Sequence, residues 1–186
     1  MKVSQVTSVF AIAIAVTLVA AIPAFAQAPA PDGAARADRI QMPTAAISRA
    51  ETRALVEGAL AFAASTGIAA GIAVVDQAGD LIAAERSEGG TYRNVKFATG
   101  KAFAAAIFGQ TTEQLGAVQK TRPDRYMGIM NMYPGKVYLV GGGVPLVLDG
   151  KLIGAVGVAG LPEGVDEKAG RAGIAAWMKY RETMKK

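Results

Sequence analysis

Apolar residues recur every three or four positions in three parts of the chain, which indicates amphipathic helices. These parts cover about residues 45–65, 94–108 and 166–183. Ser48 precedes Glu51 by three residues, the spacing of a capping box, and this supports a helix start in the first part. The pattern therefore predicts three helices, each with one apolar face against a core.

A further short helix is predicted after the second segment. Gly109 provides a stop for that segment, and Thr111 with Gln114 then repeats the capping-box spacing. The next stretch, QKTRPDRYMGIMNMYPG at residues 119–135, shows no sustained period. It predicts an irregular connection.

Branched apolar residues predict five β-strands. Residues 69–87 form one expected hairpin, with Gly79 in its turn, and residues 144–158 form another around Asp149-Gly150. Residues 137–140 add the fifth strand. Hairpin-linked strands flanked by helices predict an α+β fold, in which an antiparallel five-stranded sheet lies between helices as an αβα sandwich.

The first 26 residues have the pattern of a secretory signal peptide. A lysine near the start precedes an apolar run over residues 9–22, and small residues surround an expected cut after Ala26. The run is shorter than the roughly 20 residues that span a bilayer. Residues 27–43 are rich in proline and small residues and predict a flexible leader. We therefore expect a periplasmic or secreted protein with no membrane anchor after cleavage and a single domain over residues 44–186.

Composition limits the chemistry that this chain can perform. Its 186 residues include no cysteine and no histidine. Disulfides and thiol nucleophiles are therefore excluded, together with the commonest general base and the usual haem ligand. An enzyme built on this chain would use carboxylates, Lys, Tyr, Ser or Thr. The formal net charge of +5 comes from scattered basic residues, so nucleic acid is not an expected partner.

Seven glycines lie among the 22 residues 139–160, LVGGGVPLVLDGKLIGAVGVAG. Gly150-Lys151 is followed by leucine, which excludes a Walker phosphate loop, and the dinucleotide fingerprint lacks its last glycine. Glycines inside strands mark a place where another backbone or a ligand comes close. Two interpretations follow: a planar ligand or subunit partner lies on these strands, or alanine-rich helices pack closely against them.

Four motifs carry a resemblance to a known family. VVDQAGDLIAAE, NVKFATGKAFAAAIFG, GGGVPLVLDGKLIGAVGVAG and VDEKAGRAGIAAW together resemble the GlcG/HbpS family of haem-binding-type proteins, which is related to the C-terminal domain of PduO-type cobalamin adenosyltransferases. The resemblance covers about residues 44–180. Ala159-Gly160 stands where the family usually has Ser-Gly. The resemblance implies a helix-sheet-helix sandwich, assembly into dimers or larger oligomers, and binding of haem, iron or a corrinoid.

A haem bound to this chain would need Tyr, Met, Lys or a hydroxyl as its axial ligand. Residues 122–133 offer phenols and thioethers beside two arginines that could hold propionates, and we expect this segment to face the three glycines at 141–143 across the ligand. The predicted ligand-binding residues are Lys101, Arg122, Arg125, Tyr126, Met127, Tyr133, Gly141, Gly142, Gly143 and Asp166. The alternatives are that the Met and Tyr side chains cover the core, and that Asp166 caps a helix.

Two other ligands remain open. Met127, Met130 and Met132 form a weak candidate site for copper(I), which soft thioethers bind. Free N–H groups near residues 141–143 could hold a small organic acid. Our overall expectation is an exported, homo-oligomeric protein that binds haem, iron or a related tetrapyrrole, and for which no catalytic residue is predicted. The alternative is an enzyme or carrier for a hydroxy-acid or similar metabolite, or an accessory partner of an exported oxidoreductase.

Overall fold

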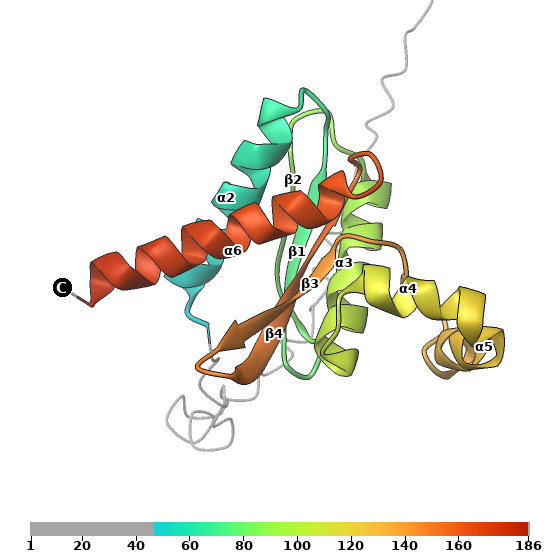
Figure 1. Ribbon diagram of the computed structural model, residues 1–186. Helices are drawn as coiled ribbons and strands as arrows, with labels where there is room; N and C mark the ends of the chain where they lie inside the picture. Colours follow the sequence, from blue (N-terminus) through green and yellow to red (C-terminus); the bar gives the residue numbers. More distant parts are fainter. Residues whose placement is uncertain (1–46, 186) are drawn as a thin grey trace, which may run out of the picture. The chain divides into compact units, whose positions relative to one another are not determined.

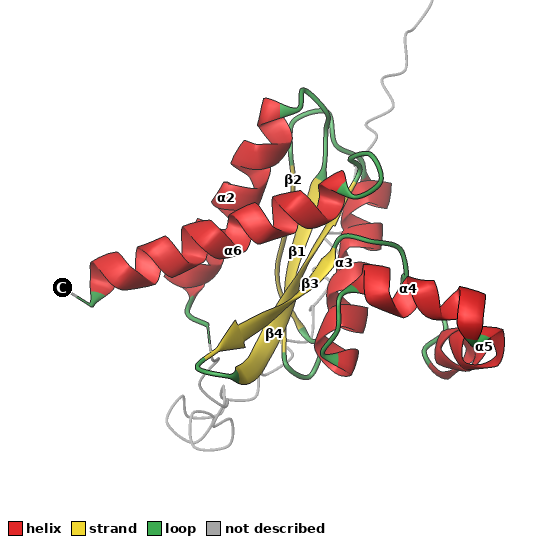
Figure 2. Ribbon diagram, viewed as in Figure 1, coloured by secondary structure: helices red, strands yellow, loops and turns green. Residues whose placement is uncertain are grey.

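The computed structural model describes residues 47–185, and the expected signal peptide and leader lie outside this range. The helices are α2 (Arg49–Ser65), α3 (Tyr92–Phe108), α4 (Thr112–Thr121), α5 (Pro123–Met132) and α6 (Val165–Met184), and the strands are β1 (Gly71–Asp76), β2 (Leu81–Arg86), β3 (Gly143–Leu148) and β4 (Lys151–Ala159) (Figures 1 and 2). Within residues 47–185, no helix is long and apolar enough to cross a membrane.

The sheet is antiparallel and has the strand order β2-β1-β4-β3. The prediction of five strands is wrong, because residues 137–140 do not join the sheet. The backbone of this segment bonds to helices instead. Tyr138 N–H donates to the carbonyl of Gly100 on α3 at 3.2 Å, and the Val140 carbonyl accepts a 2.7 Å bond from the Thr112 hydroxyl on α4.

Helices cover both faces of the sheet, as expected for an αβα sandwich. Helices α2 and α6 lie side by side over one face, while α3 runs along the other (Figure 1). The core under α2 and α6 is made of larger side chains, including Leu55, Val156 and the fully buried Trp177. The core under α3 is made mainly of alanines, such as Ala98 and Ala102.

The alanine-rich side of α3 rests directly on β4, at Gly157. A Cβ on Gly157 would lie 2.0 Å from the carbonyl oxygen of Ala98 and 2.7 Å from the amide nitrogen of Ala102. No side chain fits between this helix and this strand. Of the two interpretations of the strand glycines, close helix packing is therefore the one that Gly157 supports, and α3 occupies the place considered for a planar ligand.

Several local signals are confirmed. Ser48 and Glu51 form the capping box of α2, and Thr111 with Gln114 forms that of α4. The Asp149-Gly150 turn has positive φ at both residues, 50° and 75°, as a type I′ hairpin requires.

Residues 123–132 form a helix, so the prediction of an irregular connection is wrong there. Pro123 occupies the first turn of α5, where its missing N–H costs nothing, rather than breaking a helix. Arg122, with φ −139° and ψ 68°, separates α4 from α5. Tyr126 and Ile129, which lie one turn apart on α5, then pack against a small cluster that includes Leu115.

Candidate functional site

A buried ion pair joins α3 to α6 and brings two predicted site residues together. Lys101 Nζ lies 2.6 Å from Asp166 Oδ2, and the two residues are only 2% and 7% exposed. The other carboxylate oxygen of Asp166 accepts the N–H of Leu161 at 2.9 Å. Asp166 therefore orders the loop before α6 as well as neutralising Lys101.

The predicted glycines 142 and 143 press against this ion pair. Gly142 has φ 124°, and a Cβ there would lie 2.7 Å from Asp166 Cβ and 2.9 Å from Lys101 Nζ. A Cβ on Gly143 would lie 2.4 Å from the Lys101 carbonyl oxygen. The Gly143 N–H also donates to the Thr112 hydroxyl at 2.8 Å. These two glycines are required by packing at the pair.

Burial acts on the pKa of both partners of the pair. Desolvation lowers the pKa of Lys101, against the opposing effect of Asp166. Desolvation also raises the pKa of Asp166, against the effects of Lys101 and of the N–H groups of Leu161 and Gly160. For each group, the effect of desolvation on the pKa is thus larger than the effect of the opposite charge. A charge left without its partner at this buried position would therefore strongly destabilise the fold.

A cleft of about 480 Å³ opens beside Asp166, and we call it the acidic cleft. Its walls carry three carboxylates, and Lys101 is buried beneath them rather than lining the cleft. Its lining residues are Glu113, Val140, Gly141, Leu161, Glu163, Gly164 and Asp166. The carboxylates disfavour an anionic ligand such as a hydroxy acid or a porphyrin with two propionates.

A second cleft, of about 430 Å³, runs along the outer side of α3, and we call it the α3 groove. Its walls come from the β1–β2 turn, from the outward residues of α3 and from the segment after α5. Its lining residues are Gly79, Asp80, Leu81, Tyr92, Val95, Lys96, Thr99, Gly100, Phe103, Gly135 and Lys136. The groove thus combines apolar and aromatic walls with two lysines.

Close packing shapes the walls of the α3 groove. Gly79, with φ 87°, lets the turn lie on Phe103, because a Cβ there would be 2.6 Å from the Phe103 ring. On the other side, Lys136 Nζ lies 5.8 Å from the centroid of the same ring, within the range of a cation–π contact. Phe103 therefore contacts both the β1–β2 turn and the segment after α5 in this groove.

The predicted residues of the 122–133 segment do not gather around one cavity. Tyr126 and Tyr133 pack into the cluster behind α3, where Tyr133 contacts Phe103 edge-on at 5.5 Å between ring centroids. Arg122 forms an exposed ion pair with Asp124, and Arg125 is exposed. The prediction that this segment faces residues 141–143 across a ligand finds no such cavity among the described clefts.

The three methionines of α5 are separated by the helix. Met130 packs into the small cluster beside Tyr126, whereas Met127 and Met132 are 55% and 70% exposed. Met132 is five residues after Met127 and so points to a different side of the helix. The helix therefore gives no support to a site in which three sulfur atoms share one copper(I) ion.

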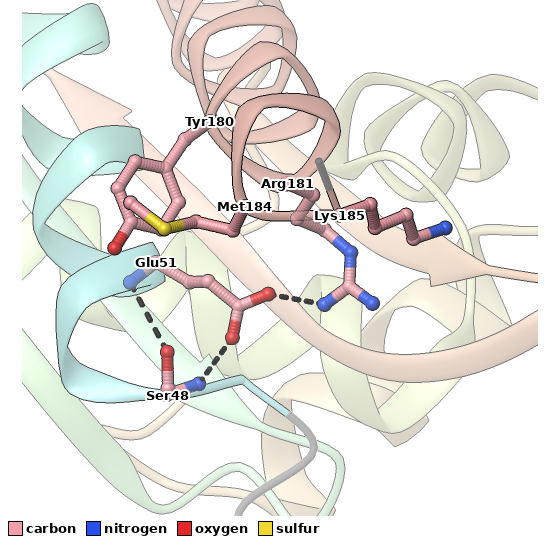
Figure 3. A pocket seen from close by; sticks show the side chains of 6 residues that line it. All are labelled: Ser48, Glu51, Tyr180, Arg181, Met184 and Lys185. Atoms are coloured by element: carbon pink, nitrogen blue, oxygen red, sulfur yellow. Dashed lines mark hydrogen bonds and ion pairs between the residues drawn. The ribbon is translucent and has the colours of Figure 1, made fainter.

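A third cleft, of about 260 Å³, lies where the start of α2 meets the end of α6. Figure 3 shows Arg181 reaching from α6 to the carboxylate of Glu51, which also accepts the Ser48 N–H at 2.8 Å. Ser48, Glu51 and Arg181 bond to one another here, so we interpret this cluster as a clip between the two helices.

Sequence reasoning missed Tyr92, Lys96 and Lys136 as site residues. Tyr92, Lys96 and Phe103 follow the helical spacing along α3, on a different side from the alanines that pack on the sheet. That second stripe was a usable signal. Lys136 had none, because its position depends on how the segment after α5 packs on α3.

The fold is a four-stranded antiparallel sheet between helices, with a buried Lys–Asp pair and an apolar groove on its single-helix side. A family model described as "Haem degrading protein HbpS-like" matches residues 47–175. The chain belongs to this HbpS-like family, as its motifs indicated.

Known proteins of similar sequence and structure agree with this assignment. The crystal structure of the PduOC:heme complex is 27% identical with a TM-score of 0.65, covering 70% of this chain and 94% of that one. A double mutant of Streptomyces reticuli HbpS is 27% identical with a TM-score of 0.64, covering 82% and 97%. An uncharacterized 15.0 kDa protein from the dhaT-dhaS intergenic region of Citrobacter freundii is 27% identical over 116 residues, covering 62% of this chain and 81% of that protein.

Proposed function

We propose that this protein binds haem, and that the ligand lies in the α3 groove. The observation that carries the proposal is the composition of that groove: an apolar floor at Phe103 with Lys96 and Lys136 on its walls. A porphyrin needs an apolar surface for its ring and cations for its propionates. Similarity to PduOC, whose structure is described as a heme complex, supports the same ligand.

The donor set of the groove fits a haem in a chain without histidine. Tyr92 offers a phenol, and phenolate is an established haem ligand in proteins. Lys96 and Lys136 would hold the propionates. The bound group would supply an iron centre and the visible absorption by which binding is measured.

The other clefts fit haem less well. The acidic cleft would repel propionates through Glu113 and Glu163. A cleft of about 590 Å³ between α2 and β2 has arginines and apolar walls, but its only side-chain oxygens come from Thr52 and Glu85. The Thr52 hydroxyl already donates to the Ser48 carbonyl at 2.9 Å. The α3 groove alone among the described clefts joins an apolar floor to lysines and a phenol.

Titration with haemin, followed by the Soret band at micromolar protein, tests the proposal. The double variant Lys96→Met and Lys136→Met keeps much of the apolar bulk but removes both charges. We expect its affinity to fall by about tenfold, equivalent to about 1.4 kcal/mol. A matched control replaces two exposed lysines of α6, Lys168 and Lys179, with Met and should bind as the wild type does. Absence of a saturable Soret shift for the wild type would overturn the proposal.

Export and self-association belong to the same proposal. The signal pattern of residues 1–26 supports export to the periplasm or beyond, and determination of the N-terminus of the protein recovered from cells would test a cut after Ala26. Exposed apolar side chains outside the groove, among them Ile68, Val147 and Met184, support a homo-oligomer. Light scattering at several concentrations would measure it.

A further inference from the structure

Tyr92 is the most exposed of the large apolar and aromatic side chains in the described part of the chain. It is the first residue of α3, lines the α3 groove and is 76% exposed. An aromatic ring packed for stability would bury most of its surface. Tyr92 instead lines the groove while most of its side chain stays exposed.

The other oxygen and nitrogen donors of the groove are less suited to iron. The Thr99 hydroxyl already donates to the Val95 carbonyl at 2.9 Å. The ammonium groups of Lys96 and Lys136 match the propionates better than the metal. Asp80 is an exposed carboxylate in the β1–β2 turn, and its charge would oppose the propionates. Tyr92 remains as the exposed oxygen donor among the lining residues of the groove.

We propose that Tyr92 is the axial ligand of haem in the α3 groove, and that its oxygen makes the site selective for ferric over ferrous haem. This inference rests on the proposed function. As the iron–oxygen bond forms, the phenol proton passes to solvent and the water molecule on the haem iron is released, with no change in oxidation state. A hard, anionic oxygen donor stabilises Fe(III) more than Fe(II).

The decisive variant is Tyr92→Phe, which keeps the ring and removes only the oxygen. Because the side chain is exposed, we expect the variant to fold normally, and far-ultraviolet circular dichroism checks this. Tyr180→Phe is the matched control, since Tyr180 lies on α6 at the clip. Asp80→Asn tests the competing carboxylate.

Two spectroscopic measurements decide the ligand. Wild-type protein with haemin should show phenolate vibrations in the resonance Raman spectrum, and its affinity for ferric haem should exceed that for dithionite-reduced haem by at least about tenfold. Tyr92→Phe should lose those vibrations and bind ferric haem about tenfold more weakly, whereas Tyr180→Phe and Asp80→Asn should not. An unchanged spectrum in Tyr92→Phe, or equal ferric and ferrous affinities in the wild type, would overturn the inference.

Metal-free protoporphyrin IX separates this inference from the proposed function. It has the ring and the propionates but no iron, so its fluorescence titration reports only the fit to the groove. Tyr92→Phe should bind it within about twofold of the wild type, while the Lys96→Met and Lys136→Met double variant should bind it more weakly. If the wild type binds neither haemin nor protoporphyrin IX, both the proposed function and this inference are wrong. Porphyrin binding with an unaltered haemin spectrum in Tyr92→Phe would remove the inference alone.

Discussion

Replacement of Asp166 by Asn should strongly destabilise the fold. The amide keeps the shape of the side chain and an oxygen for the Leu161 N–H, but it leaves the Lys101 ammonium buried without a counter-charge. Breaking one partner from a buried pair costs about 3–5 kcal/mol. That loss would be a large part of the total stability of a domain, which is roughly 5–15 kcal/mol.

Urea unfolding followed by tryptophan fluorescence would measure this loss. Trp177 is the single tryptophan of the chain and is fully buried, so its emission reports the packing of α6 directly. Asp124→Asn is the control, because it breaks an ion pair with Arg122 that is exposed to solvent. Water screens an exposed pair and leaves it little effect on stability, so this variant should unfold close to the wild type.

The ionisation of Lys101 gives the prediction a second test. Burial lowers the pKa of Lys101 below its ordinary value of 10.5 in the folded protein, so the folded state releases this proton more readily than the unfolded state. Stability should therefore rise with pH from the folded pKa towards 10.5, and more so in Asp166→Asn, which lacks the opposing carboxylate. The double variant Lys101→Met and Asp166→Leu, without either charge, should recover much of the loss. An Asp166→Asn protein as stable as Asp124→Asn would refute the reasoning.

Further predictions concern packing and the clip. Gly157→Ala should destabilise the protein by about 1–3 kcal/mol or prevent folding, because its Cβ would meet the Ala98 carbonyl, whereas Gly128→Ala on α5 meets nothing within 4 Å and should be neutral or stabilising in the same denaturation assay. Equal effects of the two would contradict the packing argument. Burial tends to raise the pKa of Glu51, but its hydrogen bonds and the Arg181 charge outweigh this and lower it. The stability from Glu51 should therefore be present above about pH 4.5 and lost as pH falls through the lower folded pKa. Thermal unfolding of Glu51→Gln should show a weaker loss at acid pH, and an acid limb identical to the wild type would count against the clip.

Local signals in the sequence predicted the parts of the fold that short-range chemistry determines. The Ser48–Glu51 spacing favours a helix start through contacts within one turn, and Asp149-Gly150 favours its turn through local backbone preference. Pro123 misled the prediction because proline both ends helices and begins them. Residues 137–140 have the composition of a strand, but they pack against helix α3 instead. Gly100 permits this because it has no side chain where Tyr138 comes close.

The candidate site could be predicted only in part. Lys101 and Asp166 were both named from their motifs, but they are 65 residues apart, and only the completed fold makes them partners. The α3 groove was missed because it depends on exposure, and a sequence does not state which side of an alanine-rich helix faces water. Tyr92 stands out only once the opposite side of α3 is known to rest on the sheet.

The backbone contact between α3 and β4 has a consequence for how any guest would bind. At Gly157 the backbones of α3 and β4 are in direct contact, so no side chains can rearrange to let the helix move over the strand. The ion pair of Lys101 with Asp166 also ties α3 to α6. The floor beneath a guest is therefore preorganised, and the entropic penalty of association falls mainly on the guest and on the few long side chains at the rim. We therefore expect a ligand to associate with the α3 groove in a single kinetic step, without a slow rearrangement of the protein.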